Sequence, residues 1–71
     1  MIIYTVALAG AGTWDDVFDL QDDINYWCEE NGARNCMDRT INTRSIIIKD
    51  NMDGVAFKLK FGQYIIKEEN I

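Results

Sequence analysis

The sequence TWDDVFDLQDDINYWCEENG, residues 13–32, repeats its apolar side chains with the period of an α-helix. At about 100° per residue, one side of such a helix is apolar and the opposite side is acidic. The apolar side consists of Trp14, Val17, Phe18, Leu20, Ile24, Trp27 and Cys28. The stretch therefore predicts one long amphipathic helix that buries its apolar side against the rest of the chain.

Both ends of this predicted helix carry boundary signals. Thr13 is a favourable N-cap, and Asp16 three residues later resembles the acidic partner of a capping box. Asn31-Gly32 supplies the stop, because glycine readily takes the left-handed conformation that closes a helix. We therefore expect the helix to span residues 13–31, with a length of about 27 Å.

The opposite side of the helix is acidic and includes one aromatic residue. The candidate protein-binding residues on this side are Asp15, Asp19, Asp22, Asp23, Tyr26, Glu29 and Glu30. No Lys or Arg occurs in residues 1–33, so neighbouring carboxylates repel one another, although a surface that needs only solubility usually mixes its charges. Two interpretations stay open: a solvated face of an acidic protein, or a docking face for a basic partner with Tyr26 as its aromatic anchor.

Length and composition indicate a single globular domain over residues 1–71. The chain of 71 residues is 48% hydrophobic and 27% charged, with a net charge of −5. The charge is uneven, because residues 1–33 contribute −7 whereas residues 34–71 contribute +2 from seven basic and five acidic side chains. An acidic protein is repelled by nucleic acid at long range. Direct RNA or DNA binding is therefore not expected, although nucleic acid could be what the acidic face imitates.

The sequence predicts a cytoplasmic protein without a metal or cofactor. The first residues lack the basic region of a signal peptide, and no apolar stretch approaches the roughly 20 residues of a membrane span. Cys28 and Cys36 are expected to be reduced core residues, with a disulfide as the minor alternative. With no His and no second Cys pair, no metal site is expected.

Catalytic signals are weak, and we expect no enzymatic activity. The chain has no His, the usual proton carrier at neutral pH, and Ser45 is its only serine. Gly10-Ala11-Gly12 could form a phosphate-binding loop, but it lacks a third Gly and a Lys, and Asp15 and Asp16 would oppose an anion there. A Mg²⁺ site on the acidic helix would need ligands from a second element.

Four segments have the pattern of β-strands. Residues 1–9 (MIIYTVALA) and 45–49 (SIIIK) are apolar and β-branched, as in buried strands, whereas residues 35–42 (NCMDRTIN) alternate like a half-exposed strand. Asn42-Thr43 is expected to form a hairpin turn. Residues 63–67 (QYIIK) form a last short strand, and residues 68–71 are expected to fray.

Residues 50–61 fit both a helix and a strand. Helical spacing is met by Met52, Val55, Ala56 and Leu59, and strand alternation by Val55, Phe57, Leu59 and Phe61. We favour the helix because Asp50 or Asn51 can cap it, lysines lie in its last turn and Gly62 follows as a stop. Gly54 opposes this choice by about 1 kcal/mol.

The element order β-α-β-β-α-β is that of the ferredoxin-like fold, a two-layer α+β sandwich. In that fold the first and third strands are central, which agrees with the apolarity of residues 1–9 and 45–49. The alternative is β-α-β-β-β, with residues 55–61 as a strand. Because both helices cover one face of the sheet, the other face is open and could support self-association. The side chains on this open face are either Ile3, Thr5 and Ala7 or Ile2, Tyr4, Val6 and Leu8.

The stretch SIIIKDNMDGVAFKLKFG, residues 45–62, resembles the C-terminal portion of many small proteins of T4-like tailed bacteriophages. These proteins often end in a strand, an acidic turn and a helix that closes with Phe-Lys-Leu-Arg-Trp-Gly or a variant, which residues 57–62 match. The chain departs from the pattern at Gly54, where Ala is more usual, and at Phe61, where Trp is common. The resemblance implies an accessory phage protein in the host cytoplasm, a class whose members often bind and inhibit a host factor.

Two functions follow as hypotheses. In the first, the protein is a phage-type inhibitor whose acidic helix docks on a basic surface of a host or defence protein, with carboxylates in place of nucleic-acid phosphates. In the second, it is a non-catalytic structural or regulatory module that forms a homodimer or larger homo-oligomer through its open sheet face. In the second case the acidic helix would only keep the assembly soluble. Neither hypothesis involves a membrane.

Overall fold

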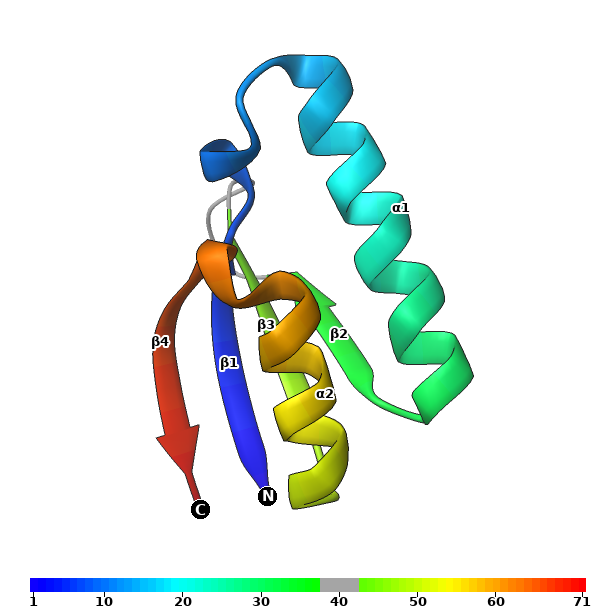
Figure 1. Cartoon of the computed structure of the whole chain (residues 1–71), viewed down its shortest axis with the longest axis vertical. Helices are drawn as coiled ribbons and strands as arrows, with labels where there is room; N and C mark the ends of the chain where they lie inside the picture. The colour runs from blue at the N-terminus through cyan, green and yellow to red at the C-terminus, as the bar shows by residue number, and fades with distance from the viewer. Residues whose placement is uncertain (38–42) are drawn as a thin grey trace.

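In the computed structural model, which describes residues 1–37 and 43–71, two helices cover one face of a four-stranded antiparallel sheet (Figure 1). The strands are β1 (Ile2–Ala7), β2 (Arg34–Met37), β3 (Thr43–Ile48) and β4 (Ile65–Asn70), and the helices are α1 (Trp14–Asn31) and α2 (Asn51–Phe61). Short 3-10 helices at Leu8–Ala11 (η1) and Gly62–Tyr64 (η2) follow β1 and α2. The strand order β2-β3-β1-β4 confirms the ferredoxin-like α+β fold.

β1 and β3 are the central strands, as their apolarity predicts. β1 pairs with β3 on one side, where Ile2 lies opposite Ile48 and Tyr4 opposite Ile46, and with β4 on the other side. Residues 51–61 form helix α2, so the alternative with residues 55–61 as a strand is wrong.

All four predicted strands differ from the structure at one end or both, and the last, predicted at residues 63–67, begins at Ile65 because Gln63 and Tyr64 belong to η2. The first strand ends at Ala7, and Leu8–Ala11 turn into η1 before α1 begins. The second strand is described as Arg34–Met37, and residues 38–42, with Asn42 of the predicted turn, lie outside the described residues. Thr43 belongs to β3, which runs from Thr43 to Ile48.

The C-terminal residues do not fray, contrary to the prediction. β4 continues to Asn70, which lies opposite Ile2, and the Ile71 amide donates a hydrogen bond of 2.9 Å to the Met1 carbonyl oxygen. The prediction of a frayed chain end was wrong, because residues 68–70 pair with β1 and are held in the sheet. An edge strand tolerates charged side chains, since much of its surface meets water.

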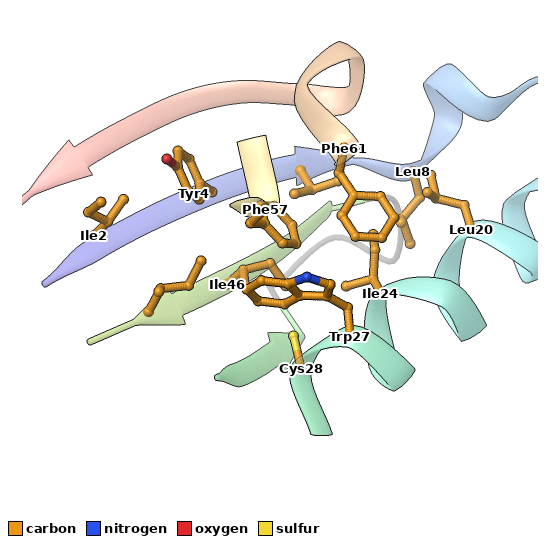
Figure 2. Packing of buried hydrophobic residues seen from close by; sticks show 12 residues of the cluster. Ile2, Tyr4, Leu8, Leu20, Ile24, Trp27, Cys28, Ile46, Phe57 and Phe61 are labelled. Atoms are coloured by element: carbon orange, nitrogen blue, oxygen red, sulfur yellow. The ribbon is translucent and has the colours of Figure 1, made fainter. Parts of the chain in front are cut away.

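The core lies between the helices and the sheet and is centred on Phe57 of α2 (Figure 2). The Phe57 ring stacks on Tyr4 of β1 at 5.5 Å between centroids and meets the edge of Trp27 of α1 at 5.0 Å. Phe61, one turn further along α2, lies 4.9 Å from Phe57. One aromatic side chain therefore joins the sheet and both helices.

Both ends of α1 lie where they were predicted, but only part of its apolar side is buried. The capping box is present: Thr13 Oγ1 accepts a hydrogen bond from the Asp16 amide, and the Asp16 carboxylate accepts one from the Thr13 amide. Gly32 closes the helix at φ 67°. The buried side chains are those of Leu20, Ile24, Trp27 and Cys28.

Trp14 and Phe18 were predicted to face the core, and this prediction was wrong. They are 68% and 57% exposed. The 18 residues of α1 span about 27 Å, whereas a six-residue strand such as β1 spans about 20 Å. The first turns of α1 therefore extend past the end of the sheet and have less to pack against (Figure 1).

α2 buries the face that contains Gly54, Phe57 and Phe61. The apolar set that indicated a helix, from Met52 to Leu59, instead faces outward. Gly54 is explained by its neighbours, because a Cβ atom built on it would lie 2.5 Å from Ile2 Cδ1. The missing side chain lets α2 approach β1 closely.

Of the two predicted sets of β1 side chains, the set of three residues lies on the open face of the sheet. Ile3, Thr5 and Ala7 lie on it and are partly exposed, whereas Ile2, Tyr4, Val6 and Leu8 are buried under the helices. Ile3 lies directly opposite Ile47 of β3, so two isoleucines are neighbours on this face.

Candidate protein-binding face

The predicted site residues all lie on the exposed surface of α1. Every one of Asp15, Asp19, Asp22, Asp23, Tyr26, Glu29 and Glu30 is exposed. At 100° per residue they cover roughly 120° of the helix circumference. We call this surface, defined by these seven residues, the acidic face. It lies opposite the side of α1 that packs on the core, so burial of one side orients the other toward water.

The carboxylates of the acidic face have no ion-pair partner among the described residues. Between residues in the ranges 1–37 and 43–71, the ion pairs are Lys58–Glu68 at 3.3 Å and Lys67–Glu69 at 3.0 Å. Each ion pair involves a glutamate of β4, and neither involves α1. Within the described residues no ion pair neutralises the acidic face, so its charge is open to solvent ions and to a basic partner.

One edge of the acidic face borders a hollow of about 440 Å³ between α1 and the end of α2. Asp19 and Asp23 line it from α1, and Lys60 and Tyr64 line it from the other side. The Lys60 ammonium lies 5.5 Å from the Phe61 ring centroid, an aromatic contact rather than a salt bridge to α1. The remaining residues of the acidic face turn away from this hollow.

An aromatic pair that the helical pattern did not predict to be exposed lies beside the acidic face. The exposed rings of Trp14 and Phe18 are 6.3 Å apart between centroids and follow the side of α1 away from α2. Trp14 and Val17 also line a hollow of about 330 Å³ near the start of α1. No sequence signal indicated this exposure, because the predicted strand at residues 1–9 would span about 30 Å, as much as the helix, whereas β1 ends at Ala7.

The start of α1 does not offer a phosphate site. The Asp16 carboxylate accepts hydrogen bonds from the Thr13 amide and hydroxyl, at 3.4 and 3.0 Å. It therefore takes the position at the helix N-terminus that an anion would occupy. Within the described ranges, no three His, Cys, Asp or Glu side chains converge to hold a metal ion.

Both cysteines are free thiols, and Cys28 is buried against the core. Burial raises the pKa of the Cys28 thiol to about 11. The thiol is thus protonated near neutral pH, and a protonated buried thiol is a poor nucleophile. Cys36 is only partly buried, so the prediction of a core position was wrong for it.

No family model, curated protein or solved structure matches the chain. The fold and the site define it as a small ferredoxin-like α+β protein with an acidic helical face. Neither described helix has the length and apolarity that crossing a membrane requires. The resemblance of residues 45–62 to phage proteins stays a hypothesis.

Proposed function

We propose that this protein is a non-catalytic binding module whose acidic face docks on a basic surface of another protein. The observation that carries the proposal is the set of six exposed carboxylates on one helix, none of them paired with a described cation. Such like-charged neighbours destabilise a helix mildly, by a few tenths of a kcal/mol per pair. A partner with Lys and Arg side chains would remove this repulsion, so the acidic face is stabilised most when it is bound.

The partner is a protein that ordinarily holds nucleic acid. A rod with carboxylates on successive turns presents a line of negative charge, as a phosphate backbone does. The resemblance of residues 45–62 to phage proteins points to a host or defence protein as the target, with inhibition as the result. Tyr26 lies among the carboxylates and would be the aromatic contact of this interface.

Capture from a lysate of the native host, at low and at high salt, tests the proposal. The tagged protein should retain a basic protein at low salt and lose it at high salt, because exposed charges are screened. Asp19→Asn, Asp22→Asn and Asp23→Asn together should abolish the capture without unfolding the protein. Capture of the same protein by this triple variant at high salt would overturn the proposal.

A matched control separates the acidic face from total charge. Asp53→Asn, Glu68→Gln and Glu69→Gln change the net charge by the same amount on α2 and β4. This control should leave the capture at low salt unchanged. Equal losses in both triple variants would show that only the net charge matters.

A second candidate function is homo-oligomerisation through the open face of the sheet. It is favoured by the neighbouring Ile3 and Ile47 side chains, which lie partly exposed on that face. Light scattering discriminates between the two functions. A stable dimer that Ile3→Lys dissociates, and that the Asp19, Asp22 and Asp23 substitutions leave intact, would favour the second.

A further inference from the structure

The outer side of α2 is apolar, although it faces water. Met52, Val55 and Leu59 are 81%, 60% and 85% exposed, and Ala56 lies between them. These four residues, which we call the α2 stripe, lie opposite the side that buries Phe57. A surface helix normally carries polar residues there, so the α2 stripe has the composition of a contact surface.

Lysines flank the α2 stripe near the end of the helix. Lys58 lies on the side of β4, where it pairs with Glu68, and Lys60 lies on the side of α1, where it lines the hollow with Asp19. Both lysine side chains are exposed. A surface that covers the α2 stripe should therefore combine apolar and acidic groups.

The same molecule carries such a surface on α1. The rings of Trp14 and Phe18 form an exposed apolar pair, and Asp15 and Asp22 lie next to them at helical spacing. We call these four residues the α1 edge. It supplies the aromatic side chains that the α2 stripe lacks and charges opposite to those of Lys58 and Lys60.

Symmetric pairing of two α2 stripes is disfavoured by charge. α1 and α2 lie side by side over the same face of the sheet (Figure 1). An antiparallel two-fold pair of α2 helices would turn the acidic faces of two α1 helices toward each other. A parallel pair would bring Lys58 and Lys60 against the same lysines of the second copy. Both arrangements place like charges together.

We propose that the α2 stripe of one copy binds the α1 edge of another copy, head to tail. Met52, Val55 and Leu59 then cover the aromatic pair, while Lys58 and Lys60 approach the carboxylates. Because the two surfaces differ, a pair of bound copies leaves one α2 stripe and one α1 edge free, so further copies can extend the assembly as a chain or close it into a ring. The area buried between one pair of helices is smaller than the roughly 1,200 Å² of a stable protein interface. Association is therefore weak and requires a high protein concentration. The inference does not depend on the proposed function, although both use carboxylates of α1.

Two complementary variants test this proposal. Trp14→Ala with Phe18→Ala removes the α1 edge, and Met52→Gln with Leu59→Gln removes the α2 stripe. All four side chains are exposed, so both variants should fold, which circular dichroism checks. In sedimentation equilibrium at millimolar concentration and low salt, the unchanged protein should exceed the mass of a dimer and each variant should be a monomer. An equimolar mixture of the two variants should form a 1:1 dimer that grows no further.

Each of the following outcomes would overturn the proposal. An unchanged protein that stays monomeric under these conditions has no such contact. A mixture of the variants that stays monomeric shows that the two surfaces do not bind each other. An assembly that both variants retain, or that stops at a dimer, assigns the contact to another surface such as the open face of the sheet.

Discussion

The Tyr4 hydroxyl donates a hydrogen bond of 3.0 Å to the carbonyl oxygen of Gly54. The bond is buried and joins the central strand β1 to the first turn of α2, which are far apart in the sequence. It is possible because Gly54 has no side chain to hold the helix away from the strand. The phenol ring below the hydroxyl stacks on Phe57, so one residue contributes both a polar and an apolar contact to the same helix.

Tyr4→Phe should lower the free energy of unfolding by about 1 kcal/mol, the typical net contribution of one hydrogen bond. The ring contact with Phe57 is retained, so the fold should persist. Urea denaturation measures the change. Tyr64→Phe is the control, because the structure gives its partly exposed hydroxyl no such bond, and it should change stability by less than about 0.5 kcal/mol. Equal effects of the two changes would contradict the assigned role of the Tyr4 hydroxyl.

Gly54→Ala should change the free energy of unfolding by less than about 1 kcal/mol, because the better helix propensity of alanine is offset by the displacement of the Ile2 methyl group. The added Cβ would lie 2.5 Å from Ile2 Cδ1, so the helix or the isoleucine must move. Ile2→Val removes that methyl group and alone should cost about 1 kcal/mol. In the double variant the clash is absent, so this variant should be more stable than the sum of the two single changes predicts. Additive changes would show that the two residues are not in contact.

The fold was predictable because several signals agreed. The two most apolar runs became the central strands, and the Thr13 cap and the Gly32 stop placed α1 correctly. The buried side of α2 was not predictable, because each of its two sides is apolar with helical spacing. Hydrophobicity alone does not choose between Phe57 and Leu59. The buried side is the one that lets α2 approach β1 closely at Gly54. It can be identified only when the position of β1 relative to the helix is known.

The candidate site was predictable in part. The carboxylates of α1 lie where the helical period put them, because charged groups remain in water wherever the helix packs. The exposure of Trp14 and Phe18 was not predictable from the period, since they lie on the apolar side of the helix. It depends on where the sheet ends beneath α1, which only the assembled fold defines (Figure 1).

Deletion of residues 68–71 should lower the free energy of unfolding by about 3 kcal/mol, from several lost strand hydrogen bonds at about 1 kcal/mol each. These residues pair with the start of β1, where Glu68 lies opposite Tyr4 and Asn70 opposite Ile2. Thermal or urea unfolding measures the loss. Glu68→Gln with Glu69→Gln is the control, because it removes two exposed ion pairs and keeps the strand, and it should cost less than about 1 kcal/mol. A deletion without effect would restore the original expectation of a frayed end.

The buried Cys28 thiol should make the protein less stable at alkaline pH. Burial raises its pKa from the ordinary 9.0 to about 11, so the unfolded chain loses this proton first. The protonated, buried thiol makes its full contribution to the free energy of unfolding below pH 9, and this contribution is lost as the pH rises toward 11. At pH 10.5 the loss should be about 2 kcal/mol. Between pH 8 and pH 10.5, the free energy of unfolding should fall by about 2 kcal/mol less in Cys28→Ala than in the unchanged protein. Urea titrations in the presence of a reductant measure both values. Burial also raises the Tyr4 pKa, an effect shared by both proteins. Identical pH dependence in the two proteins would contradict a buried thiol at this position.

The potential around the acidic face can be measured through Trp14 without any partner. Trp14 is exposed beside Asp15, whereas Trp27, the second tryptophan, is buried in the core. In a Trp27→Phe variant, quenching of the remaining fluorescence should be enhanced for the cation caesium and reduced for the anion iodide, each relative to its quenching of a free tryptophan amide, because a negative surface concentrates cations. High concentrations of an inert salt should remove the difference, since the Debye length falls to about 3 Å at 1 M. Trp14→Phe is the control, and its fluorescence should respond weakly to both ions. If iodide quenching were enhanced more than caesium quenching relative to the free tryptophan amide, the carboxylates of α1 would not set the potential at its exposed surface.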